Sequence, residues 1–277
     1  MNIAAVRGGW AGRGGGEAGR QACEPPGAGQ GGAMRAGRPV DRTGSPSAGL
    51  VLAGGRSSRM GHSKAALPWG GTTLVAHLAG VVGSAVGGPV VVVRAPGQPL
   101  PSLPAGVEVC EDPEEGVGPL LGLGTGLQAL AGRAGVAFAC ATDMPHLSGP
   151  FVRRVLEGFE GDEDVEMVLP VVGGVAQPLA AGYRTTLVGR IEALLAGGVR
   201  SLSALGDTGL VRRLDERALL RSPELRAADP QLHAVRGLNT RADYQAALAQ
   251  LTPAMAPAVP TSASNGGHPD DLLDRGA

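Results

Sequence analysis

The apolar and polar positions along the chain alternate in the manner of strands followed by helices. Short apolar runs, each ending at glycine or a polar residue, predict four buried strands at 48–53, 89–93, 107–110 and 136–141. Between them, apolar stripes or Thr, Ser and Pro start signals predict helices at 72–86, 119–130 and 148–159. This order favours an α/β fold with a mostly parallel sheet and helices on both faces.

The second half of the pattern adds an antiparallel excursion. Strands are predicted on either side of a glycine turn, Gly173-Gly174, at 165–172 and 175–183. Helices are predicted at 184–196 and after Asn239. Ligands of such sheets bind at the carboxyl ends of the strands, which here carry the loops 54–71, 111–118 and 142–147.

Composition separates the two ends of the chain from its middle. Many of the 47 glycines and 22 prolines fall in the first 47 and the last 27 residues, where large apolar residues are scarce. Such segments bury too little apolar surface to offset their ordering entropy. We therefore expect a disordered N-terminal extension at 1–47, a single domain at 48–250 and a disordered tail at 251–277.

Charge and cysteine content exclude several classes of protein. The formal net charge of -1 argues against a nucleic-acid partner. The three cysteines are odd in number and lack metal-type spacing, which argues against a disulfide framework or a zinc site and favours the cytoplasm. No run approaches the ~18 apolar residues of a membrane span, so no membrane partner is expected.

The loop after the first strand has the composition of a phosphate-binding segment. Gly54 and Gly55 let backbone amides approach a ligand, and Arg59 and Lys64 supply positive charge. The Gly-Lys pair of a Walker loop and the G-x-G-x-x-G fingerprint are both absent. A surface loop with solvated basic residues is the alternative interpretation.

Lysine usage favours the functional interpretation. Lys64 is the only lysine among the 24 lysine and arginine residues. A compact ammonium and a rigid guanidinium are not equivalent on crowded phosphate oxygens. The position of this lysine in the glycine-rich loop therefore marks it as functional.

Carboxylates follow two of the predicted strands. Asp143 comes directly after the fourth strand, and Glu111-Asp112 ends the third. A carboxylate at this edge can bind Mg²⁺ together with substrate phosphates. The alternative is a turn-capping aspartate at Asp143 and ordinary loop polarity at Asp112.

Several motifs occur in the order seen in the MobA-like nucleotidyltransferases, which the segment 48–250 resembles. They are Leu52-Ala-Gly-Gly-Arg-Ser-Ser-Arg-Met-Gly-x-x-Lys64, Glu111-Asp112, Gly118-Pro119-Leu120, Asp143-Met144-Pro145 and Leu238-Asn239-Thr240. The resemblance, strongest to the guanylyltransferases of the molybdenum cofactor, implies a Rossmann-like fold of the nucleotide-diphosphosugar-transferase type. It also implies GTP, Mg²⁺ and a molybdopterin acceptor, with molybdoenzyme maturation proteins as further partners.

The resemblance assigns roles to individual residues. It implies a nucleotide-binding backbone at 52–55, comprising Leu52, Ala53, Gly54 and Gly55, a phosphate-binding Lys64 and a nucleotide contact at Asp112. Asp143 corresponds to the residue that binds both Mg²⁺ and nucleotide, and Asn239 to an asparagine near the pterin. The chain departs from the family at Ser63, where aspartate usually precedes the lysine, and at Arg94, where asparagine contacts nucleotide.

The expected reaction is attack of an acceptor phosphate on the α-phosphorus of GTP, with pyrophosphate leaving. Charge neutralisation would dominate such a transfer, with Lys64, Arg59 and the metal on Asp143 as the catalytic groups. Transfer of CMP, or transfer to another small phosphate, stays open within the class. A non-catalytic nucleotide-binding adaptor and a nicotinamide oxidoreductase are the alternatives from other classes.

Overall fold

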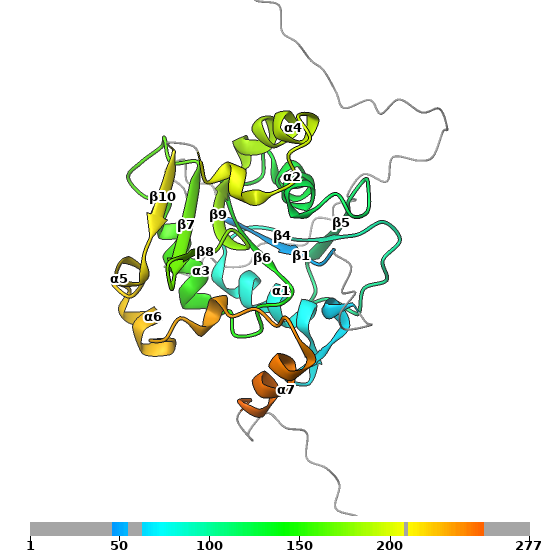
Figure 1. The fold of residues 1–277 in the computed structure, drawn as a ribbon, viewed down its shortest axis with the longest axis vertical. Helices are drawn as coiled ribbons and strands as arrows, with labels where there is room; N and C mark the ends of the chain where they lie inside the picture. The colour runs from blue at the N-terminus through cyan, green and yellow to red at the C-terminus, as the bar shows by residue number, and fades with distance from the viewer. Residues whose placement is uncertain (1–45, 55–62, 208–209, 252–277) are drawn as a thin grey trace, which may run out of the picture.

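The computed structural model describes residues 46–54, 63–207 and 210–251. Within these residues an eight-stranded mixed sheet forms the centre of the fold, in the order β10-β7-β9-β6-β1-β4-β5 with β8 paired to β7 (Figure 1). A separate two-stranded sheet pairs β2 with β3. The strands are β1 (Ala48–Leu52), β2 (Pro68–Trp69), β3 (Thr72–Thr73), β4 (Val90–Arg94), β5 (Val107–Glu111), β6 (Val136–Ala141), β7 (Met167–Val172), β8 (Val175–Ala176), β9 (Ala180–Arg184) and β10 (Val211–Leu214).

The strand directions confirm the mostly parallel sheet. β1 pairs in parallel with β4 and β6, β4 with β5, and β7 with β10. β9 runs antiparallel between β6 and β7, so β7 and β10 point the same way as β1. The carboxyl ends of β1, β4, β5 and β6 therefore meet at one edge of the sheet.

Helices cover both faces of the sheet, as the pattern predicts. α1 (Leu74–Ala85) and α3 (Gly149–Leu156) pack on one face, and α2 (Pro119–Leu130) and α4 (Val188–Ala196) pack on the other (Figure 1). Successive side chains of β1 point to opposite faces, so Leu50 joins the α2 side of the core and Val51 the α1 side. Every residue of β1 is buried, which explains why its sequence is an uninterrupted apolar run.

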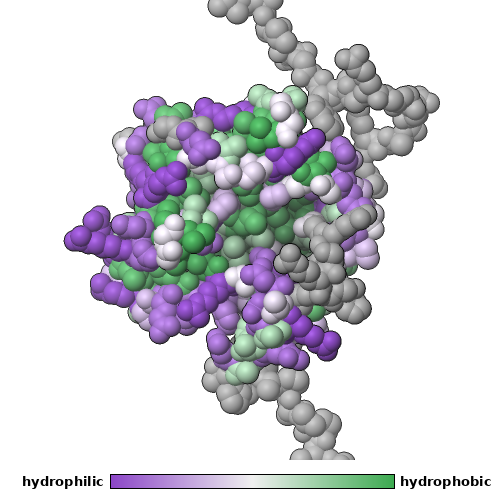
Figure 2. Space-filling model, viewed as in Figure 1, coloured by the Kyte–Doolittle hydropathy of each residue, from purple (hydrophilic) through white to green (hydrophobic). Residues whose placement is uncertain are grey.

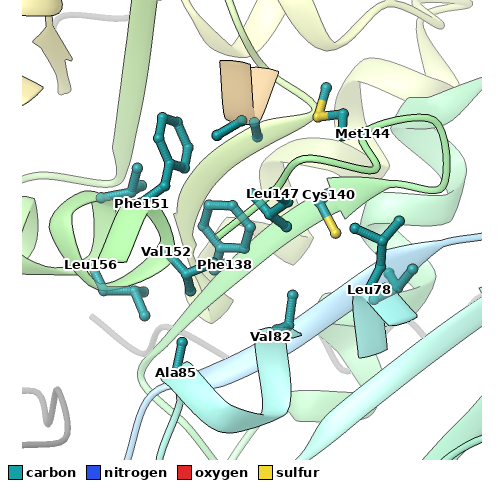
Figure 3. Close-up of a cluster of buried hydrophobic side chains, with 14 of the residues drawn as sticks. Leu78, Val82, Ala85, Phe138, Cys140, Met144, Leu147, Phe151, Val152 and Leu156 are labelled. Atoms are coloured by element: carbon teal, nitrogen blue, oxygen red, sulfur yellow. The ribbon is translucent and has the colours of Figure 1, made fainter. Parts of the chain in front are cut away.

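The core between α1, α3 and β6 packs two phenylalanines among aliphatic side chains (Figure 3). Phe138 of β6 meets Phe151 of α3 edge to face, with 6.3 Å between the ring centroids. Cys140 lies in the same cluster and is a free, buried thiol.

Proline explains the main error in the predicted elements. The expected strand at 175–183 is two strands, β8 and β9, with Pro178 between them. Proline has no N–H to donate to a ladder, and Gln177 instead donates its backbone N–H to Pro170 at 2.9 Å. The chain then crosses to pair with β6, which converts a simple hairpin into the antiparallel member of the main sheet.

The predicted helices at 148–159 and 184–196 each contain a 3₁₀ turn. These turns span Glu157–Phe159 after α3 and Thr185–Leu187 before α4. The segment between β10 and the last helix is ordered as α5 (Glu216–Leu219), α6 (Pro223–Ala228) and a 3₁₀ turn, η5 (His233–Val235). The last helix, α7, spans Arg241–Ala249.

Ser47, the residue before the predicted domain, is part of the packed structure. Ser47 is fully buried, and its carbonyl accepts a hydrogen bond of 2.9 Å from the N–H of Gly88. Of the predicted disordered ends, residues 1–45 and 252–277 lie outside the described residues. Among the described helices, none is both long and apolar enough to cross a membrane.

Close packing accounts for the glycines of α2, and it predicts opposite effects for two substitutions. A Cβ added at Gly126 would overlap the side chain of fully buried Leu50. We expect Gly126→Ala to lower the free energy of unfolding by about 1–3 kcal/mol through overpacking. Urea unfolding of the purified variant measures this change.

Gly80→Ala is the matched control on α1. Gly80 is exposed, and an added Cβ would meet no atom within 4 Å. Replacing glycine by alanine in an open helical position should raise the free energy of unfolding by about 0.5–1 kcal/mol. Equal effects of the two variants would contradict the packing account.

Candidate functional site

The candidate site lies at the edge where the carboxyl ends of β1, β4, β5 and β6 meet. Lys64 begins a 3₁₀ turn, η1 (Lys64–Ala66), that follows β1 in the chain. Asp112 follows β5 directly, and Asp143 comes two residues after β6. The structure therefore brings the predicted basic and acidic residues to one edge of the sheet.

The Lys64 ammonium is held by two acceptors from distant parts of the chain. Its Nζ lies 3.2 Å from Oδ2 of Asp143 and donates to the carbonyl of Leu238 at 2.6 Å. The two charged side chains are 21% and 25% exposed, so solvent screens their interaction only in part. The backbone N–H of Leu238 donates to the carbonyl of Asp143 at 2.8 Å, which joins the two acceptors to each other.

The position of Leu238 is set by its own surroundings. Its side chain is buried in a small apolar cluster with Trp69 and Ala247. Two residues later α7 begins at a capping box, in which Thr240 and Asp243 each bond the backbone N–H of the other. The carbonyl that Lys64 uses is therefore fixed from both sides.

Asp112 occupies the second half of the site. Its backbone N–H donates to the carbonyl of Arg94 at 2.9 Å, and its Oδ1 accepts a hydrogen bond of 2.9 Å from the hydroxyl of Thr125. Burial raises the pKa of the Asp112 carboxyl, and the Thr125 hydrogen bond lowers it by a smaller amount. A hydrogen bond from an N–H or O–H group of a ligand would stabilise the charged form of this carboxylate.

A cavity of about 420 Å³ opens beside Asp112. Its lining is mostly apolar or glycine, with three carboxylates: Leu52, Gly54, Val93, Ala95, Asp112, Glu114, Glu115, Gly116, Val117, Gly118, Pro119, Gly122, Ala141 and Leu179. Figure 2 shows that the face seen in Figure 1 is hollowed near its centre, with apolar residues on the floor. A volume of this size is that of a small-molecule site.

Glycines keep this cavity open. A Cβ on Gly122 would lie 3.3 Å from Oδ2 of Asp112, and one on Gly54 would lie 3.3 Å from the backbone nitrogen of Ala95. Gly118, which precedes α2, has a φ of 113°, a conformation that other residues rarely adopt. Side chains at Gly54 and Gly122 would narrow the space around the Asp112 carboxylate.

The predicted site residues fall into four groups. Lys64 and Asp143 are in contact, while Leu52, Gly54 and Asp112 line the cavity. The backbone of Ala53 is engaged within the protein, because its N–H donates to Val93 and its carbonyl accepts from Gln98. Gly55 and Arg59 lie outside the described residues.

The late motif lies beside the ammonium. Asn239 is exposed and follows Leu238, and its backbone N–H donates to Asp243. Sequence reasoning missed the Leu238 carbonyl, the Thr125 hydroxyl and the Gln98 amide. The Leu238 carbonyl and the Gln98 amide have no signature in a single sequence, whereas a threonine in a glycine-rich helix that faces a strand end is a signal that could have found Thr125.

Taken together, the site pairs the Lys64 cation of η1 with the Asp143 carboxylate after β6, at the edge of the sheet that also carries a mostly apolar cavity of small-molecule size. These are the parts of a nucleotide-binding transferase site at the carboxyl edge of an α/β sheet. The model of the MobA-like NTP transferase domain matches residues 49–215. The chain belongs to this family.

Relatives and solved structures agree with this assignment. The chain is 47% identical over 154 residues to proteins of Mycobacterium tuberculosis and Mycobacterium bovis named probable molybdenum cofactor guanylyltransferase, covering 53% of this chain and 72% of theirs. The crystal structure of molybdopterin-guanine dinucleotide biosynthesis protein A from Archaeoglobus fulgidus has a TM-score of 0.57 at 19% identity, covering 73% of this chain and 97% of that one. The structure of Rv0371c from Mycobacterium tuberculosis has a TM-score of 0.52 at 20% identity, covering 74% and 98%.

The raised pKa of Asp112 predicts that removing its charge increases the stability of the folded protein, by an amount that depends on pH. Folding favours the protonated carboxyl, so wild-type stability falls as pH rises through the pKa of the folded state. Asp112→Asn removes this ionisation and keeps an acceptor for Thr125. We expect its melting temperature to exceed that of the wild type at pH 7.5, with the difference shrinking towards pH 4.

The control is Asp164→Asn. Asp164 is exposed on the loop before β7, and four strands separate β7 from β5 in the sheet. Its melting temperature should follow that of the wild type over the same pH range. A constant difference between Asp112→Asn and the wild type would show that ionisation of Asp112 is not the cause.

Proposed function

We propose that this protein is a molybdenum cofactor guanylyltransferase, which transfers GMP from GTP to the terminal phosphate of molybdenum-molybdopterin and releases pyrophosphate. The observation that carries the proposal is the Lys64 ammonium, held by Asp143 and Leu238 at the edge of the sheet that also carries the cavity. The match to the mycobacterial relatives covers 72% of their length, and the names of these relatives support the choice of guanine and of the acceptor.

The cavity is the proposed nucleoside site. Leu52 and Gly54 would pack against the nucleoside, and the partly buried Asp112 would accept hydrogen bonds from its N–H or O–H groups. Gly54 favours a purine, because a Cβ there would lie 3.3 Å from Ala95 and 3.7 Å from Oδ2 of Asp112 and would narrow the space.

Lys64 is the proposed phosphate ligand. An ammonium has three donors, and Asp143 and Leu238 take two of them in a fixed geometry. The remaining donor is the one that we assign to the phosphates of GTP. Because the ammonium is positioned before substrate binds, it requires no reorganisation when charge develops on the leaving pyrophosphate.

Asp143 has the chemistry of a ligand for Mg²⁺. Its carboxylate is 25% exposed and presents hard oxygen donors, and Mg²⁺ commonly binds one or two carboxylates together with substrate phosphates and water. In the described part of the chain no cluster of three or more His, Cys, Asp or Glu could hold a metal unaided. Bound there, Mg²⁺ would neutralise charge on the phosphates.

The proposed reaction is a single displacement. An oxygen of the acceptor's terminal phosphate forms a bond to the α-phosphorus of GTP, and the bond from that phosphorus to the bridging oxygen of pyrophosphate breaks. The acceptor phosphate is already an anion, so the step needs no strong side-chain base. Lys64, with Arg59, would stabilise the leaving group, and Asn239 beside Leu238 would face the acceptor.

The remaining proposals concern the setting of the reaction. The acceptor is a molybdopterin compound, with molybdoenzyme maturation proteins as its recipients. We propose a cytoplasmic location, because GTP is available there. We also propose that the folded unit covers residues 48–250 together with Pro46 and Ser47, since Ser47 is hydrogen-bonded to Gly88.

Pyrophosphate release tests the function directly. The full chain is incubated with each of the four NTPs, with and without molybdenum-molybdopterin, in the presence of Mg²⁺. We expect release that depends on the acceptor and is fastest with GTP. Faster release with CTP would move the protein to a cytidylyl activity, and heat protection by GTP without any release would identify a non-catalytic nucleotide-binding protein.

Substitution of Lys64 tests the mechanism. Removing a preorganised charge commonly costs about 10²–10³ in rate, which is the loss in kcat expected for Lys64→Ala. Lys64→Arg keeps the charge, but a planar guanidinium cannot take the place of an ammonium between Asp143 and Leu238, so activity should also fall substantially. Steady-state kinetics with GTP measure both losses, and the melting temperatures should change little.

Arg133→Ala is the matched control, because it removes a cation that is paired with Glu108 and lies before β6, at the opposite edge of the sheet. Its kcat should stay at the wild-type value. Full activity of Lys64→Arg would contradict the proposed role of the ammonium.

A further inference from the structure

We propose that Gln98 is a positioning residue for the transfer reaction. Its side-chain amide ties the end of β1 to the residue before Lys64 and so sets where the Lys64 ammonium stands. The proposal rests on the function proposed above, because it assigns Gln98 an effect that passes through Lys64.

The Gln98 amide uses each of its polar atoms to join a different segment. Its Oε1 accepts a hydrogen bond of 3.0 Å from the backbone N–H of Ala95. Its Nε2 donates to the carbonyl of Ala53 at 3.0 Å and to the hydroxyl oxygen of Ser63 at 3.1 Å. A flipped amide would place donors against the Ala95 N–H, so the orientation of the side chain is determined by its partners.

The turn that carries Gln98 is itself anchored. Arg94 donates to the carbonyl of Gln98 at 3.0 Å and pairs with Glu111 at 2.9 Å. Glu111 also accepts from the backbone N–H of Gly97 at 3.1 Å, and Gly97 has a φ of +65° that suits glycine. Gln98 therefore reaches the β1 end from a turn fastened to β5.

The connection to the reacting centre passes through Ser63. Ser63 is adjacent to Lys64, and its carbonyl accepts the N–H of Ala66 at 3.1 Å, which closes the first turn of η1. With its side chain held by Gln98 and its carbonyl in η1, Ser63 has little freedom to shift. The Lys64 side chain thus starts from a fixed point before it reaches Asp143 and Leu238.

This arrangement also gives a role to the serine at position 63. The family that the motifs resemble usually has aspartate there, and both side chains can accept a hydrogen bond from the Gln98 amide. The bond needs an acceptor and not a charge. Ser63 is therefore compatible with a positioned Lys64.

The test is a double-mutant cycle on the full chain, with kcat/KM for GTP as the readout. The four proteins are wild type, Gln98→Ala, Lys64→Ala and the double variant. We expect Gln98→Ala to lose about tenfold in the wild-type background, the equivalent of one or two hydrogen bonds. In the Lys64→Ala background the same substitution should change kcat/KM less than twofold, because the group on which it acts is gone.

Gln128→Ala is the matched control, since Gln128 is exposed in the last turn of α2. It should leave kcat/KM unchanged in both backgrounds. An equal loss for Gln98→Ala with and without Lys64 would overturn the proposal and leave Gln98 a purely structural residue. If the wild type released no pyrophosphate, the proposed function would fail, and the same cycle read as GTP affinity would still decide the role of Gln98.

Gln98→Glu provides a second measurement should Gln98→Ala not fold. The carboxylate keeps an acceptor for Ala95 but faces the carbonyl of Ala53 without a proton to donate. Protonation restores one donor, so the activity of Gln98→Glu relative to the wild type should rise severalfold as the pH falls from 8 to 5.5. A constant ratio over this range would overturn the proposal, because a loss of packing does not depend on pH.

Discussion

The Lys64 ammonium, shared between the carboxylate of Asp143 and the carbonyl of Leu238, is the interaction on which the site depends. Its partners are 79 and 174 residues away in the sequence. They converge because β1 and β6 are adjacent and parallel, and because the capping box of α7 fixes the backbone after Leu238. Both acceptors must be held in place for the ammonium to bind them at once. The sheet fixes Asp143, and the start of the last described helix fixes Leu238.

The two halves of the site use opposite physical effects. Around Lys64, charge is compensated by a partly exposed carboxylate. Around Asp112, burial disfavours the charge, and the glycines of the cavity wall leave that carboxylate near an apolar space. Between the two halves, Gln98 donates a hydrogen bond to the carbonyl of Ala53 after β1, and Arg94 of β4 donates one to the carbonyl of Gln98. Burial of the Asp112 charge thus destabilises the fold, whereas burial of the apolar strand β1 stabilises it.

The sequence predicted the elements whose signals are local. The limits of β6 and α2 agree with the prediction, because β6 is an apolar run in the centre of the sheet and α2 starts at Pro119. The predicted strand at 175–183 was wrong, since Pro178 breaks it and tertiary pairing with β6 outweighs the hairpin pattern. Lys64, Asp112 and Asp143 could be selected by residue type and position. The Leu238 carbonyl and the Gln98 amide could not, because a backbone oxygen has no residue signature and an amide on a turn looks like any other polar residue of an exposed loop.

The place of Leu238 in the chain has a consequence for the order of assembly. All strands of the described sheet are complete by Leu214, and the cavity walls are formed earlier still. A nascent chain can therefore fold its sheet and enclose the cavity on the ribosome while Lys64 still lacks the second of its two acceptors. The pocket and the charged centre can therefore form at different stages of synthesis, because the centre needs the carbonyl of Leu238 as its second acceptor.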